Sequence, residues 1–102
     1  MLPNYEEDAS KRRERFRIIA DVLKAAKRGV TKTEIMYKAG LSFALLTQYL
    51  SLLVKAELIE SNKINKRTIY QTTTKGHQFL QRYGEMEHLL QRNTTHDVRI
   101  LQ

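Results

Sequence analysis

The sequence contains no cysteine, which excludes a disulfide framework and any metal site built on thiolates. Its one proline lies in the N-terminal segment MLPNYEEDAS, which carries acids and lacks the apolar stretch of a secretory signal. No apolar run approaches the ~20 residues that span a bilayer. We therefore expect a soluble, cytoplasmic protein with no membrane partner.

Positive charge is what the chain has in excess. Its 102 residues correspond to one domain, with 18 Lys and Arg against 11 Asp and Glu, and a formal net charge of +7. This balance favours a polyanionic partner, with nucleic acid ahead of an anionic membrane surface. The alternative is a basic protein without such a partner. A chain this short buries only a modest core, so pairing with a second copy would help it.

The N-terminal half predicts two helices after a flexible arm of residues 1–9. From Ser10 to Arg28, apolar residues recur at helical spacing, and the following Gly29 is a common way to end a helix. Thr31 and Glu34 then have the spacing of a capping box, with Thr at the N-cap and Glu at N3. This pattern predicts a second, shorter helix.

Gly40 can adopt the left-handed conformation that closes this second helix. Ser42 is a favourable N-cap for a third helix, which is expected to run to about Lys55. The tight turn at Gly40 lets the second helix brace the third from behind. This is the helix-turn-helix arrangement.

The C-terminal half begins with a predicted β-hairpin over residues 58–72, whose turn-like tip is Asn62–Lys66. An irregular loop is the alternative. Thr72 or Thr73 then caps a fourth helix. The fold class is therefore mainly α with a small hairpin: a winged helix-turn-helix over residues 10–73, followed by a long C-terminal helix. The helix is expected over 74–92. Residues 93–102 are a tail whose structure the sequence does not decide.

The third helix has an apolar face that packs on the first two helices and an outward face of small or hydrogen-bonding residues. Solvent-facing helix positions usually carry long charged side chains, so this outward face is suited to close approach, as in the major groove of DNA. Gln48 has the amide for a bidentate contact to adenine, and Thr47 suits a thymine methyl or a phosphate. The predicted DNA-contacting residues of this helix are Ser42, Phe43, Ala44, Thr47, Gln48, Ser51 and Lys55.

The hairpin would be the wing, with Lys63, Lys66 and Arg67 near the phosphates. Several of these assignments have a second interpretation. Thr47 and Ser51 can simply be solvated, and Phe43 can be a partial core residue. The basic run over residues 11–17 is either a phosphate-binding flank or a solvated first turn.

The fourth helix carries a seam of apolar residues spaced four, three and four, as in a coiled-coil heptad. We expect this seam to be a homodimer interface. Its residues are Phe79, Tyr83, Met86 and Leu90.

The stretch IIADVLKAAKRGVTKTEIMYKAGLSFALLTQYLSLLVKAELIE, followed by Tyr70 and TTTKGHQFL, resembles a family of small archaeal winged-helix proteins. The resemblance covers roughly residues 16–90. It implies DNA binding by a two-fold dimer that forms through a C-terminal antiparallel coiled coil, and roles in nucleoid organisation or transcriptional control. The DNA surface would be residues 42–51 with the wing cations. The seam covers barely two heptads, so the dimer geometry stays open.

Nothing in the sequence favours an enzyme, a cofactor or a small-molecule ligand. There is no Gly-rich phosphate loop and no nucleophile elbow. His77 and His88 lie on one face of the fourth helix but ~16 Å apart along its axis, so they cannot share one metal ion within a chain. The sequence therefore leaves two hypotheses: a homodimeric double-stranded DNA-binding protein, or a winged-helix module that binds other proteins without contacting DNA. RNA is a lesser candidate, because no aromatic platform for base stacking is present.

Overall fold

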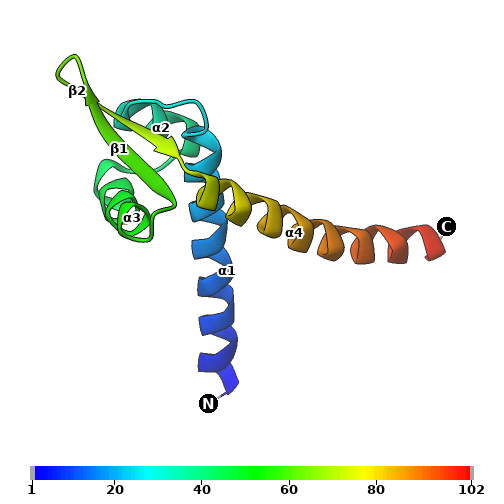
Figure 1. Ribbon diagram of the computed structural model, residues 1–102. Coiled ribbons are helices and arrows are strands. Elements are labelled where there is room, and N and C mark those ends of the chain that lie inside the picture. The colour runs from blue at the N-terminus through cyan, green and yellow to red at the C-terminus, as the bar shows by residue number, and fades with distance from the viewer. Residues whose placement is uncertain (1, 102) are drawn as a thin grey trace.

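The computed structural model describes the backbone of residues 2–101 and the side chains of residues 11–91. Four helices and two strands follow one another along the chain (Figure 1). They are α1 (Leu2–Ala25), α2 (Lys32–Ala39), α3 (Phe43–Lys55), β1 (Ile59–Ile64), β2 (Arg67–Thr72) and α4 (Thr74–Leu101). The expected fold class, a winged helix-turn-helix followed by a C-terminal helix, is confirmed. None of the described helices is both long enough and apolar enough to cross a lipid bilayer.

The core lies where α1, α2, α3 and the start of the hairpin meet. Leu23 of α1, Ile35 of α2, Leu46 and Leu53 of α3, and Ile59 of β1 are all fully buried. Burial of side chains of this size stabilises by roughly 1.5–3 kcal/mol each. These contacts fix α3 against the body of the domain, so that only its outward face remains available.

The caps of α2 and α3 are the predicted ones. The Thr31 side chain accepts a hydrogen bond from the Glu34 N–H, and the Glu34 carboxylate accepts one from the Thr31 N–H at 2.9 Å. Gly40 has a φ of 67° and closes α2 through a bond from its N–H to the carbonyl of Met36. The Ser42 hydroxyl accepts from the Leu45 N–H and opens α3. The angle between the two helices is thus set by local chemistry.

The first strand of the hairpin is longer, and the turn shorter, than the sequence predicted. Residues 62–64, expected in the turn, continue β1, and the register pairs Ile64 with Arg67. The turn consists of Asn65 and Lys66, with φ angles of 51° and 67°. Two positive φ angles in succession are typical of the tight turn whose twist matches that of the flanking strands. The cations of the wing are therefore held at the end of a paired hairpin.

The junction between β2 and α4 is anchored to the end of α3 without a free linker. The Thr73 hydroxyl caps α4 by accepting from the Gly76 N–H, and it donates to the carbonyl of Glu57 at 2.6 Å. Lys75 donates to the carbonyl of Ala56 at 2.9 Å. The buried Thr72 hydroxyl donates to the carbonyl of Leu23 in α1. Thr73 is thus the cap of α4, and Thr72, the other candidate, is a core residue.

Gly76 marks the closest approach of α4 to the rest of the domain. A Cβ atom at this position would lie 2.3 Å from the carbonyl oxygen of Leu58 and 2.6 Å from Cγ2 of Thr72. The first of these is backbone and cannot rotate away. We therefore expect Gly76→Ala to lower the free energy of unfolding by about 2 kcal/mol, the usual range for overpacking. Chemical denaturation of the purified protein measures it.

Gly84 provides the matched control for this substitution. It lies in the same helix, and a Cβ atom there would meet nothing within 4 Å. Gly84→Ala should therefore raise the free energy of unfolding by about 0.5–1 kcal/mol through helix propensity alone. If both variants have the same stability, the close approach at Gly76 does not constrain the junction.

Two helices extend beyond the predicted bounds. α1 begins at Leu2, not at Ser10, so the segment expected as a flexible arm is helical in its backbone, and α1 ends at Ala25 instead of Arg28. α4 continues through 93–101, which the sequence had left open. The side chains of both outer segments lie outside the described residues. The division into arm, winged-helix domain, dimerisation helix and tail stays a prediction.

Candidate nucleic-acid interface

All seven predicted residues of α3 are exposed on its outward face. The buried side of the helix is formed by Leu46, Leu50 and Leu53, as the apolar periodicity predicted. Leu52 was expected to flank the packed face, but its side chain is 52% exposed. The outward face is therefore a continuous surface of small and hydrogen-bonding side chains.

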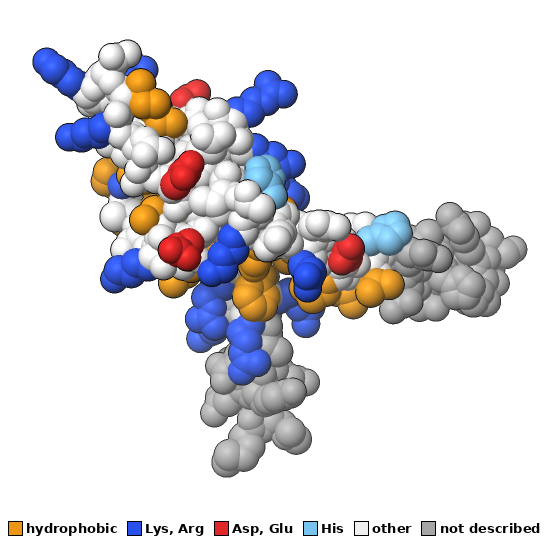
Figure 2. Space-filling model, viewed as in Figure 1, with side chains coloured by type: hydrophobic (Ala, Val, Ile, Leu, Met, Phe, Trp, Pro, Cys, Tyr) orange, Lys and Arg blue, Asp and Glu red, His pale blue; other side chains and the backbone are white. Residues whose placement is uncertain are grey.

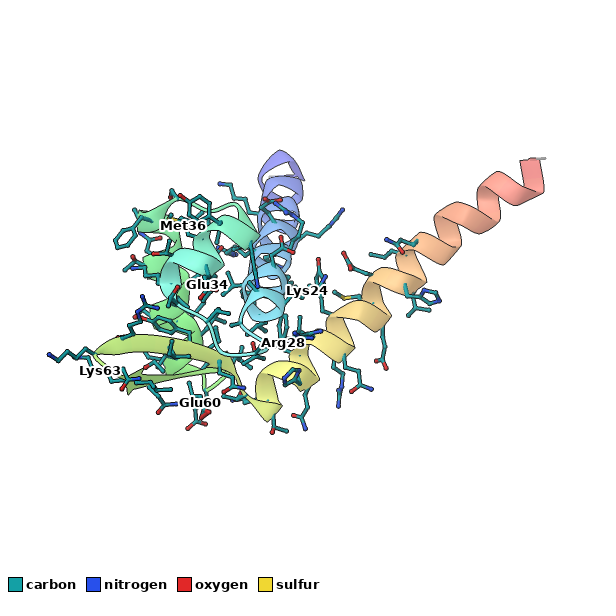
Figure 3. The ribbon with its side chains drawn as sticks, turned by 90° about the horizontal axis from the view of Figure 1, so that it is seen from above. Lys24, Arg28, Glu34, Met36, Glu60 and Lys63 are labelled. Carbon is teal, nitrogen blue, oxygen red and sulfur yellow. The ribbon has the colours of Figure 1, made fainter. Side chains whose placement is uncertain are left out.

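The wing lies beside this helix. α3 packs next to β1, and both point to the side of the molecule opposite to α4 (Figure 1). Lys63, Lys66 and Arg67 are exposed, and Lys63 extends from the far end of the hairpin (Figure 3). Figure 2 shows the positive side chains that stand out from the hairpin tip. Among the side chains of residues 11–91, no acid forms an ion pair with these three cations.

Lys32, at the start of α2, reaches across to the first turn of α3. Its ammonium group donates a hydrogen bond to the Thr47 hydroxyl and lies 3.7 Å from the centroid of the Phe43 ring. The Thr47 hydroxyl in turn donates to the carbonyl of Phe43 at 2.8 Å. These three side chains therefore form one connected unit at the leading end of α3. Phe43 is 63% exposed, which makes it a surface residue and not a partial core residue.

A hollow of about 530 Å³ lies between the start of α2 and the wing. Two cations, Lys32 and Arg67, line it together with Thr31, Thr33, Thr68 and Tyr70. Hydrogen bonds from Thr31 are the main cause that lowers the pKa of Glu34, and the charges of Lys38 and Arg67 add to this effect. The Arg67 charge on the wing thus acts on Glu34 in the first turn of α2.

Half of the predicted dimer seam packs within the chain instead. Phe79 lies between Phe16 of α1 and Tyr83, with ring centroids 6.3 Å and 6.2 Å away. Tyr83 is only 9% exposed, and burial raises the pKa of its phenol. Both residues have the spacing of a coiled-coil seam, but they hold α4 against α1.

The rest of the seam remains at the surface. Met86 and Leu90 are 47% and 57% exposed, and Leu89, which the heptad pattern did not include, is 63% exposed. An apolar hollow of about 200 Å³ lies between Met86 and the aromatic cluster, and its lining includes Met86, Tyr83 and Phe16. Figure 2 shows this apolar stripe along the described part of α4.

The basic run of α1 is solvent-exposed throughout. Within it, Arg17 is paired with Glu14 and Asp21. The other cations, at positions 11, 12, 13 and 15, form no ion pair with the described side chains. Both interpretations of this run remain compatible with its geometry.

Sequence reasoning missed Lys32. The only feature of the sequence that pointed to Lys32 was its position directly after the Thr31 N-cap. At this point a helix-turn-helix brings its second helix toward the third. Leu89 was missed because a strict heptad omits the residue that flanks the seam. Both residues border surfaces that the sequence had identified, and they widen those surfaces.

The family model described as "Winged helix-turn-helix" matches residues 12–91. No curated protein matches the sequence at significant similarity.

Solved structures share the fold at low sequence identity. Sso10a-2, a DNA-binding protein from Sulfolobus solfataricus, has a TM-score of 0.73 and 24% identity, over 83% of this chain and 90% of its own. MepR from S. aureus, in a complex with DNA, has a TM-score of 0.58 and 20% identity, over 99% and 94%. The transcriptional regulator PcaV from Streptomyces coelicolor has a TM-score of 0.67 and 18% identity, over 74% and 57%.

Proposed function

Because this chain belongs to the winged helix-turn-helix family, we propose that it binds double-stranded DNA, with α3 in the major groove and the hairpin along the phosphate backbone. One observation carries the proposal. The outward face of α3 is exposed and free of acidic side chains, and it lies beside a wing whose three cations form no ion pair with any described acid. Such a surface matches the shape and the charge of a duplex.

The parts of this surface have different roles. Lys63, Lys66 and Arg67 neutralise phosphates and set the position of the protein on the duplex. Gln48, in the middle of α3, presents its amide to a base edge, where a bidentate contact to adenine fits it. Ser51 and Lys55 follow along the same face. The role is binding and not catalysis.

We further propose that two copies pair through α4. The exposed side chains of Met86, Leu89 and Leu90 form the contact, while Phe79 and Tyr83 fix the base of the helix on α1. A dimer would present two copies of α3 and two wings, which doubles the number of phosphate contacts. The biological role would be that of an archaeal-type chromatin-associated protein or transcriptional regulator, located on the nucleoid in the cytoplasm.

A second function is a protein-interaction module without direct DNA contact. The exposed Phe43 and Leu52 on α3 favour it, because large apolar side chains at a surface often mark a protein contact. Stoichiometric capture of a protein partner, with no duplex binding near physiological salt, would support this alternative.

Fluorescence anisotropy on a random-sequence duplex across a salt series tests the DNA proposal. The slope of log affinity against log salt becomes more negative by about 0.9 for each phosphate neutralised on a duplex. We expect a steep slope. Absence of binding even at low salt would overturn the proposal.

The wing cations should account for part of this slope. Replacing Lys63, Lys66 or Arg67 singly with Gln is expected to reduce its magnitude by about 0.9, one phosphate contact each. Lys24→Gln is the matched control, since Lys24 lies on α1, away from the wing tip (Figure 3). If the wing variants keep the slope of the unchanged protein, the hairpin does not contact the backbone.

A further inference from the structure

We propose that the leading end of α3 recognises the 5-methyl group of thymine through Phe43 and Thr47, and that Lys32 is the positioning residue that holds both side chains in place. This inference rests on the proposed DNA binding and adds a chemical preference to it. It concerns one of the two roles that the sequence left open for Thr47, a thymine methyl or a phosphate.

The hydrogen bonds of Thr47 decide between these roles. A threonine hydroxyl has one proton to donate. In Thr47 this proton is directed to the carbonyl of Phe43 at 2.8 Å, and the oxygen accepts from the Lys32 ammonium. The hydroxyl therefore has no donor left for a phosphate or a base acceptor. Of the two roles, phosphate or thymine methyl, the one that remains for Thr47 is contact through its methyl group.

Phe43 supplies the second apolar group. Phe43 and Thr47 are four residues apart in one helix, so they are neighbours on its surface. The ring is 63% exposed at the start of α3, and Ala44 beside it adds an exposed methyl. The thymine methyl projects into the major groove, and Phe, Ala and Thr methyl groups are the side chains that contact it. The leading end of α3 thus carries the apolar side chains that contact a thymine methyl group.

Lys32 fixes this arrangement before DNA binds. Its ammonium lies 3.7 Å from the ring centroid of Phe43 and also bonds the Thr47 hydroxyl, so one side chain from α2 restrains two on α3. A cation over an aromatic face contributes roughly 0.5–1 kcal/mol at an exposed site. Without it, the ring gains rotamer freedom and Thr47 keeps only its bond to the Phe43 carbonyl, so binding must order both side chains at a greater cost.

The test compares one random-sequence duplex pool prepared with thymidine against the same pool prepared with deoxyuridine, which lacks only the methyl group. We expect the protein to bind the thymidine pool about fourfold more tightly per contacted methyl, equivalent to about 0.8 kcal/mol for a buried CH₂ group. Phe43→Ala and Thr47→Ser should each reduce the ratio toward one. Thr47→Ser keeps the hydroxyl, so its effect reports on the methyl alone.

The controls separate this inference from general binding. Thr74→Ser removes an exposed threonine methyl at the start of α4 and should keep the full ratio. Lys32→Met should lower the ratio, and Lys32→Arg should restore part of it. If Lys32→Met weakens both pools equally, its positioning role is overturned.

Equal binding of the unchanged protein to both pools overturns the inference alone. So does a thymidine preference that Phe43→Ala and Thr47→Ser leave unchanged, since it then comes from the shape of the duplex. Absence of binding to either pool overturns the proposed function and this inference together.

Discussion

Replacing Gln48 and Ser51 together with Glu should weaken duplex binding by about a hundredfold or more. Each base-edge contact is worth roughly 1–3 kcal/mol, and each new carboxylate also meets the negative potential of the groove. Because both positions are exposed on α3, the substitutions leave the core untouched. Anisotropy titration at one fixed salt concentration measures the effect.

A second double variant controls for net charge. Gln78→Glu with Gln81→Glu adds the same two negative charges on exposed positions of α4, away from α3. We expect it to reduce affinity only severalfold through long-range electrostatics. If the two double variants bind equally well, α3 is not the docking face and only the overall charge matters.

The second large effect concerns the proposed dimer. Met86→Lys with Leu90→Lys should convert the protein to monomers, with a dissociation constant at least about a hundredfold higher, because two charges would enter an apolar contact in each copy. Light scattering should then report the chain mass of 12.0 kDa instead of twice that value. DNA affinity should fall as well, because a monomer contacts the duplex with one α3 and one wing, whereas the dimer would use two of each.

The opposite face of α4 supplies the matched control. His77→Lys with His88→Lys places two cations on exposed positions outside the seam and should leave the dimer intact. Lysine is a good helix former, so neither pair should unfold α4, which circular dichroism verifies. A dimer that survives Met86→Lys with Leu90→Lys would place the contact elsewhere.

What could be predicted from the sequence is what short-range chemistry determines. The capping box at Thr31, the left-handed Gly40 and the Ser42 cap each depend on residues within four positions of one another. The apolar face of α3 follows from its periodicity. These local rules were sufficient for the helix-turn-helix and for the seven predicted outward residues of α3, but not for the exposed Leu52.

What could not be predicted depends on contacts between distant residues. The bond from Lys32 to Thr47 joins residues on two helices, and no periodicity encodes it. The seam on α4 has one spacing from Phe79 to Leu90, yet Phe79 and Tyr83 pack near α1 while Met86 and Leu90 are about half exposed. A heptad pattern gives the face of a helix but not the partner that covers it. The hairpin turn was predicted too long because Ile64 is the only apolar residue in Asn62–Lys66, and only the pairing register distinguishes strand from turn there.

The anchored junction at Thr73, Lys75 and Gly76 has a mechanical consequence. α4 cannot pivot on the domain without breaking hydrogen bonds to the end of α3 and separating Gly76 from Leu58. In a dimer formed through α4, the two copies of α3 would therefore keep a fixed separation and a fixed rotation relative to each other. A duplex whose helical repeat does not match that geometry must bend or twist to bind, at a cost of roughly 1–6 kcal/mol. The stiffness of the duplex, in addition to its base sequence, would then select where the protein binds.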